Sequence, residues 1–175
     1  MTAERRCVCF GSSRTDPDGV AGRLAHACGV EIARLGWTLM SGGYEGAMGA
    51  ASRGAAGTGG RVIGVTTSIF QERAANSALH EEWTEPDYLA RMSTLLRQGH
   101  AFLGLPGGLG TLSEWMVAWC LASIGQLPGP LVLFRDPWEP VLLRVCDLEE
   151  VGDDPARLVH WIDDPGDLSR ALGLA

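Results

Sequence analysis

Three glycine-rich strings with hydroxyl or acidic neighbours are the residues of this sequence best suited to chemistry. They are Gly11-Ser12-Ser13, Ser41-Gly42-Gly43-Tyr44-Glu45-Gly46 and Pro106-Gly107-Gly108-Leu109-Gly110-Thr111. A glycine-rich turn that opens a helix exposes N–H groups at the positive end of the helix dipole and lets a ligand come close. Such a turn suits a phosphate, and in the third string Thr111 provides a hydroxyl as an additional donor. One such loop could equally be a tight turn, but three of them predict an anion site.

Two features that the sequence lacks restrict the class of ligand and of enzyme. None of the strings reads Gly-x-Gly-x-x-Gly, so the sequence favours a mononucleotide or a sugar phosphate over a dinucleotide. The chain also contains no lysine, because all 14 of its basic residues are arginine. A pyridoxal-phosphate enzyme needs a lysine for its Schiff base, and a Walker phosphate loop needs its own lysine. Both classes are therefore excluded.

Arg91 and Glu114 are the charged residues with a candidate catalytic role. Glu114 follows Thr111 by three residues, which is the spacing of a capping box, where the glutamate bonds back to the start of its helix. In the first turn of a phosphate-binding helix, the same carboxylate would also face the sugar of a ligand. Arg91 lies to the side of its helix's apolar pattern and is, taken alone, typical of a solvated surface arginine. Both residues keep a structural and a functional interpretation.

Short apolar runs alternate with helical patterns along the chain, which is typical of βαβ units and a parallel sheet. We predict strands over residues 6–10, 37–40, 61–65, 101–105, 130–134 and 158–162, and helices over 20–35, 47–56, 88–98, 111–124, 139–145 and 165–172. Right-handed crossovers then give a doubly wound, Rossmann-like α/β fold in a single domain, 1–175, with strand order 3-2-1-4-5 and a sixth strand. The polar segment 69–86 is predicted as a loop over the site. The three strings follow predicted strands, so they meet at the carboxyl edge, where ligands bind.

Bulk properties limit the partners. A net charge of −7 argues against a general affinity for nucleic acid. No apolar run approaches a membrane span and no signal-peptide core follows the start, so we expect a cytoplasmic protein without membrane contact. The five cysteines lie in apolar stretches without a CxxC pair, which predicts buried free thiols. The four histidines show no metal-ligand spacing, so no metal site is expected.

The strings and the two charged residues together resemble the LOG ("lonely guy") family, cytokinin riboside 5′-monophosphate phosphoribohydrolases formerly described as possible lysine decarboxylases. The resemblance runs to about residue 134 and rests on Ser41-Gly42-Gly43-x-x-Gly46-x-Met48-Gly49-Ala50, on Arg91, and on Pro106-Gly107-Gly108-x-Gly110-Thr111-x-x-Glu114. It implies hydrolysis of the N-glycosidic bond of a nucleoside 5′-monophosphate, AMP or its N6-modified cytokinin form, to free base and ribose 5-phosphate. The resemblance assigns catalysis to Arg91 and Glu114 and implies a homodimer or larger homo-oligomer. No cofactor is expected for this reaction.

The predicted substrate- and phosphate-binding residues are Ser12, Ser13, Gly43, Gly107, Gly108, Gly110 and Thr111. Two positions depart from the plant-type motif, because Met92 replaces a lysine and Leu109 a tyrosine. The missing lysine is expected to remove one cation near the substrate, so the identity of the base stays open. A carrier or sensor that binds a nucleotide or cofactor without hydrolysis is the alternative function. Transfer of the sugar to a second base, as in deoxyribosyltransferases, is a third.

Overall fold

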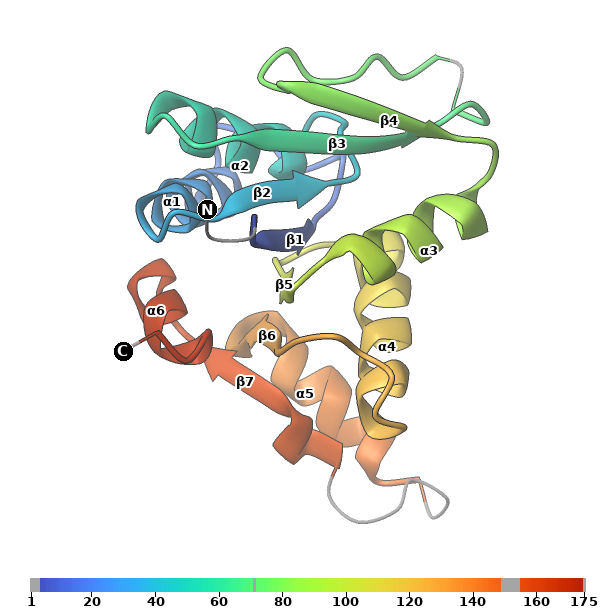
Figure 1. Ribbon diagram of the computed structural model, residues 1–175. Coiled ribbons are helices and arrows are strands. Elements are labelled where there is room, and N and C mark those ends of the chain that lie inside the picture. The colour runs from blue at the N-terminus through green and yellow to red at the C-terminus, as the bar shows by residue number, and fades with distance from the viewer. Residues whose placement is uncertain (1–3, 71, 149–154, 175) are drawn as a thin grey trace.

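A seven-stranded parallel sheet runs through the computed structural model, which describes residues 4–70, 72–148 and 155–174 (Figure 1). Its strands are β1 (Arg6–Phe10), β2 (Thr38–Ser41), β3 (Val62–Thr67), β4 (Glu81–Glu85), β5 (Ala101–Gly104), β6 (Leu131–Phe134) and β7 (Val159–Ile162). They are hydrogen-bonded in the order β4-β3-β2-β1-β5-β6-β7. The predicted order of strands is confirmed, and β4 is an additional edge strand.

Helices cover both faces of the sheet, which confirms the doubly wound fold. They are α1 (Val20–Arg34), α2 (Ala47–Gly57), α3 (Tyr88–Gln98), α4 (Leu109–Ser123), α5 (Arg135–Cys146) and α6 (Leu168–Ala171), with short 3₁₀ helices η1 (Pro155–Leu158) and η2 (Pro165–Asp167). Helices α1, α2 and α6 cover one face, and α3, α4 and α5 cover the other. The chain first builds outward from β1 to β4 and then returns to β5 on the other side of β1. This reversal opens a crevice at the carboxyl ends of β1 and β5.

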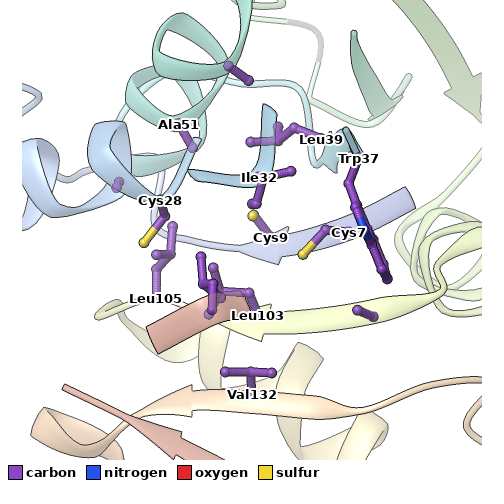
Figure 2. Close-up of a cluster of buried hydrophobic side chains, with 14 of the residues drawn as sticks. Cys7, Cys9, Cys28, Ile32, Trp37, Leu39, Ala51, Leu103, Leu105 and Val132 are labelled. Carbon is purple, nitrogen blue, oxygen red and sulfur yellow. The ribbon is translucent and has the colours of Figure 1, made fainter. Parts of the chain in front are cut away.

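The strands are short and mostly apolar because both of their faces are covered. On the face of α1 and α2, Cys7, Cys9 and Leu39 pack near Cys28 and Ile32 in one buried cluster (Figure 2). The other face contacts a second cluster, to which the helices contribute Met92, Leu95, Leu96, Trp115, Ala118, Trp119, Trp138 and Leu142. An apolar layer therefore covers each face of the sheet.

The prediction of a loop over residues 69–86 is wrong for its last third, where β4 pairs with β3. The five residues of β4 alternate between half-buried and exposed, as at a solvated sheet edge. Polar pairs stabilise this edge, since Thr66 Oγ1 donates to Glu82 Oε1 at 2.7 Å. A strand without an apolar run gives no strand signal in the sequence. The described residues of the preceding segment, 68–80, form turns, and its Asn76 is buried beside α2.

Cys7, Cys9 and Cys28 are free thiols and are buried as predicted. Burial raises the pKa of the Cys28 thiol, which therefore stays protonated and packs as a small apolar side chain. The prediction of burial is wrong for Cys120, which is exposed on α4, and for Cys146, which is half-buried. Trp115 and Trp119 are buried on the inner face of α4, whereas Cys120 lies outside the buried residues of that helix. No helix in the described ranges is long and apolar enough to cross a membrane.

Candidate active site

A cavity of about 340 Å³ lies at the carboxyl edge of the sheet, where the crevice opens. The loop after β1 contributes residues 11–14, the loop after β2 and the start of α2 contribute Tyr44 and Met48, and segment 68–80 contributes Phe70 and Arg73. Helix α3 contributes Tyr88 and Arg91, and the amino end of α4 contributes residues 108–111 and Glu114. Its volume is that of a small-molecule site.

Arg91 of α3 and Glu114 of α4 form an ion pair at this cavity. Arg91 Nη1 donates to Glu114 Oε1 at 3.1 Å, and Arg91 Nε donates to the carbonyl oxygen of Val65 at 2.7 Å. The two side chains are only 4% and 7% exposed. Because buried charges are tolerated when they are paired and hydrogen-bonded, the two residues depend on each other. The interpretation of Arg91 as a solvated surface arginine is therefore wrong.

Gly42 makes room for the guanidinium of Arg91. A Cβ atom at Gly42 would lie 1.6 Å from Arg91 Nη2 and 2.8 Å from Met48 Sδ. On another side, the centre of the Tyr44 ring lies 5.7 Å from Arg91 Cζ, within the range of a cation–π contact. The Tyr44 hydroxyl accepts from the Thr67 N–H at 2.9 Å and donates to the Thr67 carbonyl oxygen at 3.2 Å. The second glycine-rich string thus positions the arginine, a role that the sequence did not reveal.

Burial raises the pKa of Glu114, and the charge and hydrogen bond of Arg91 offset only part of that rise. Burial disfavours the charged carboxylate, whereas a neighbouring cation favours it. An acid perturbed in this way, in a cavity and beside a specific partner, is typical of a functional site. Such a carboxylate can orient a water molecule or sugar hydroxyls and can stabilise a cation-like sugar. Among the described residues, no three His, Cys, Asp or Glu side chains are grouped to hold a metal ion.

The amino end of α4 opens onto the same cavity. Gly108 is its N-cap residue, and the first N–H groups of a helix have no partner within the helix. A Cβ atom at Gly108 or Gly110 would meet nothing within 4 Å, so this backbone is open to a ligand. Thr111 Oγ1 is buried and has no hydrogen-bond partner in the described part of the chain. An unpartnered hydroxyl beside open amides suits an anion such as phosphate.

The capping box expected from Thr111 and Glu114 does not form. Helix α4 begins at Leu109, two residues before the predicted start, so Thr111 lies inside the first turn and cannot be the cap. Glu114 falls one turn further on, where its carboxylate accepts from Arg91 instead. The capping interpretation of Glu114 is therefore wrong, and its interpretation as a site residue stays a prediction.

Most of the predicted site residues line the cavity, namely Ser12, Ser13, Arg91, Gly108, Gly110, Thr111 and Glu114. Gly43 and Gly107 are not part of the lining. Gly43 has a φ of +77° and turns the loop after β2 toward Gly64, whose Cα would be 3.1 Å from an added Cβ. A Cβ atom at Gly107 would lie 2.2 Å from Thr111 Oγ1, so Gly107 leaves room for that side chain. Substrate binding by the predicted residues stays a prediction.

Several lining residues were missed as site residues, namely Arg14, Tyr44, Phe70, Arg73 and Tyr88. Phe70 and Arg73 come from the segment expected to lie over the site, but nothing in their spacing identified them. Tyr44 and Phe70 pack edge to face with ring centres 5.8 Å apart. The available signal was Arg14, which directly follows the serines of the first string.

The two departures from the plant-type motif have different places in the structure. Met92 is 6% exposed and belongs to the apolar cluster shared by α3 and α4, not to the cavity lining. The expectation that methionine at this position removes a cation near the substrate stays a prediction. Leu109, which is 81% exposed, does line the cavity at its rim.

Comparison with known proteins gives a family match and curated relatives. The family described as "possible lysine decarboxylase" matches residues 48–172. A cytokinin riboside 5′-monophosphate phosphoribohydrolase of Mycobacterium marinum is 37% identical over 118 residues, or 66% of this chain and 62% of the relative. Its namesake from Mycobacterium tuberculosis is 36% identical over 119 residues, with the same coverage. The chain thus spans about three fifths of the length of these relatives.

Solved structures share the fold over nearly their whole length. The molybdenum cofactor binding protein of the phototrophic bacterium Rippkaea orientalis is 23% identical, with a TM-score of 0.77, and covers 97% of this chain. The molybdenum cofactor carrier protein of Chlamydomonas reinhardtii is 24% identical, with a TM-score of 0.74 and the same coverage. At these identities the likeness concerns the fold alone. The family match covers most of the chain and agrees with the glycine-rich strings, so the chain belongs to the LOG family, described as possible lysine decarboxylases.

Proposed function

We propose that this chain hydrolyses the N-glycosidic bond of a nucleoside 5′-monophosphate, AMP or N6-modified AMP, to a free base and ribose 5-phosphate. The observation that carries the proposal is the buried Arg91–Glu114 pair in the same cavity as the open amino end of α4. The name of the curated relatives supports the same reaction. Lysine decarboxylation through a pyridoxal Schiff base is excluded because the chain has no lysine.

The 5′-phosphate binds at the amino end of α4 in this proposal. The backbone amides near Gly108 and Gly110 and the unpartnered hydroxyl of Thr111 donate to its oxygens. The helix dipole adds a favourable interaction with the negative charge. Glu114 lies one turn along the same helix, so a phosphate held there directs the attached ribose toward the carboxylate.

The bond between C1′ and the base nitrogen breaks with its electron pair leaving on the base. The ribose then carries positive charge, which the Glu114 carboxylate stabilises. Water attacks C1′ and gives a proton to Glu114, and the departing base takes up a proton from solvent, so that the net change is addition of water across the broken bond. Arg91 holds the carboxylate in place through its hydrogen bond, while the Val65 carbonyl oxygen fixes Arg91 itself.

The test is to incubate the purified chain with AMP and with N6-modified AMP and to separate free base and ribose 5-phosphate by chromatography. We expect release by the wild type and a loss of about 10²–10⁴-fold in Glu114→Gln, as for removal of an acid–base group. The control is Glu31→Gln, which removes an acid on α1 that pairs with Arg34 outside the cavity. Equal turnover in the two variants would refute the role of Glu114.

A nucleotide or cofactor carrier is the second candidate, because the chain matches the molybdenum cofactor proteins over nearly their full length. A carrier has no need of a buried carboxylate beside the sugar. The same assay separates the two functions. If AMP raises the melting temperature but no nucleotide is cleaved, the chain is a carrier. If a second free base accelerates loss of the nucleotide by forming a new one, it is a transferase.

The proposed assembly is a homodimer or larger homo-oligomer in the cytoplasm. Leu109 and Val117 of α4 and its C-cap residue Ile124 are exposed, and in this proposal a second copy covers these apolar side chains. Cys7, Cys9 and Cys28 are free thiols in the apolar core, which suits a reducing compartment. Size-exclusion chromatography with light scattering measures the mass of the assembly. A monomeric mass at micromolar concentration would refute the proposed oligomer.

A further inference from the structure

Two arginines of the cavity have no carboxylate partner. Most arginines of the described chain form ion pairs, and the third arginine of the cavity, Arg91, is paired with Glu114. Arg14 and Arg73 both line the cavity, and within the described ranges neither lies within ion-pair distance of a carboxylate. On a chain with a net charge of −7, two uncompensated cations at one opening favour an anion there.

Local contacts hold Arg73 in place. Its Nη1 donates to Ser13 Oγ at 3.2 Å, and its Cζ lies 4.7 Å from the centre of the Phe70 ring. Asn76 fixes the same segment to the loop after β2, because its Nδ2 donates to the carbonyl oxygens of Gly43 and Tyr44 at 3.0 and 3.2 Å. An arginine held in advance loses less conformational entropy when it binds a ligand.

These arginines lie apart from the amino end of α4. Arg14 follows β1, and the contact with Ser13 places the Arg73 guanidinium over the same loop. Helix α4 instead follows β5, which is the neighbouring strand, roughly 5 Å away at the usual strand spacing. One ligand can therefore reach both positions from a single cavity.

We infer that Arg14 and Arg73 form a second anion subsite, so that the preferred ligand of this cavity is a nucleotide carrying a second anionic group. The inference rests on the proposed binding of one phosphate at α4 and adds the class of substrate. Arginine suits this role because its planar guanidinium donates two parallel hydrogen bonds to a phosphate or carboxylate. The second group is borne by the ribose, by the first phosphate or by the base.

The experiment measures dissociation constants by calorimetry in a Glu114→Gln background, which slows turnover during the titration. The ligands are AMP, adenosine 3′,5′-bisphosphate, ADP and AMP with a dicarboxylate on N6, so that each doubly anionic ligand places its second group differently. At least one of them should bind about tenfold or more tightly than AMP, as for an added charge-assisted contact. In Arg73→Gln and Arg14→Gln, the ratio of the AMP dissociation constant to that of the doubly anionic ligand should fall toward one. The matched control is Arg97→Gln, an exposed arginine outside the cavity.

The ratio of the dissociation constant of AMP to that of each doubly anionic ligand decides the inference. If the chain that keeps Arg14 and Arg73 binds no doubly anionic ligand more tightly than AMP, the inference is overturned. A preference that survives both cavity substitutions, or one that Arg97→Gln reduces equally, would also overturn it. If Arg73→Gln weakens AMP and the bisphosphate by the same factor, the arginines hold the single phosphate and the inference is wrong. Release of base from AMP by the unsubstituted chain is measured separately, so failure of the proposed hydrolysis is distinguished from failure of the subsite.

Discussion

Gly42→Ala should disable the site by displacing Arg91 without changing the fold. The added methyl carbon would lie 1.6 Å from Arg91 Nη2, whereas non-bonded contacts of this kind need roughly 3.5 Å. The nearest atoms all belong to the side chains of Arg91 and Met48. We therefore expect the guanidinium to move into the cavity while β2 stays in place.

Two hydrogen bonds set the size of the effect, those from Arg91 to Val65 and to Glu114. Each bond to a charged group contributes about 1.5–3 kcal/mol, but the displaced guanidinium regains water in the cavity. The net loss should resemble other overpacked substitutions, about 1–3 kcal/mol. For a chain of this length, the melting temperature should fall by about 2–12 °C. Release of base should fall by about 10²–10³-fold, as when a positioned electrostatic group is lost.

The assay compares base release and thermal unfolding in Gly42→Ala and Gly57→Ala. Gly57 ends α2, and a Cβ atom there would meet nothing within 4 Å, so this control should keep full activity and stability. If Gly42→Ala melts at a lower temperature yet releases base at the wild-type rate, the position of Arg91 does not matter and the reasoning is refuted.

Three further substitutions and one pH profile test the site. Thr111→Val removes an unpartnered hydroxyl, so unfolding should be unchanged while the KM for AMP rises about tenfold; an unchanged KM would contradict phosphate binding by Thr111. Gly110→Ala fills open space in a helix, so stability should rise by up to about 1 kcal/mol while calorimetry shows weaker AMP binding. Because burial raises the pKa of Glu114, kcat/KM should fall with acid at a higher pH than for an ordinary glutamate. Arg91→Gln removes an influence that lowers this pKa, so the fall should move to still higher pH; a shift to lower pH would contradict the pairing.

The sequence predicts those elements whose burial repeats at a clear period. Helix α3 has the predicted bounds, Tyr88–Gln98, because an apolar pattern follows Asp87, whose side chain caps the helix by accepting from the Ala90 N–H. Strand β4 lacks such a signal, because a solvated edge strand needs polar residues and resembles a loop. Helix α4 starts earlier than predicted because Thr111 resembles a cap, whereas Gly108 occupies that position.

The candidate site was predictable where one string contains the whole feature. Glycine leaves backbone amides open to a ligand, so the string at the start of α4 by itself indicates an anion site. The contact between Arg91 and Glu114 joins two helices, and no spacing between residues 23 positions apart reports it. The spacing of Glu114 from Thr111 pointed instead to a local bond, which the carboxylate forgoes because a buried guanidinium is the stronger partner. Gly42 could not be interpreted without knowing where Arg91 lies.

The ion pair is also part of the core through its neighbours in the chain. Arg91 directly precedes Met92, and Glu114 directly precedes Trp115; Met92 and Trp115 lie in the same apolar cluster. The packing that seats α3 and α4 on the sheet therefore also sets the distance between the guanidinium and the carboxylate. Since side chains in a packed core move only with their helices, a change in this cluster alters the geometry of the pair before it unfolds the chain. In this fold, the apolar layer beneath the cavity does the positioning, and the glycine-rich loops above it leave the space for a ligand.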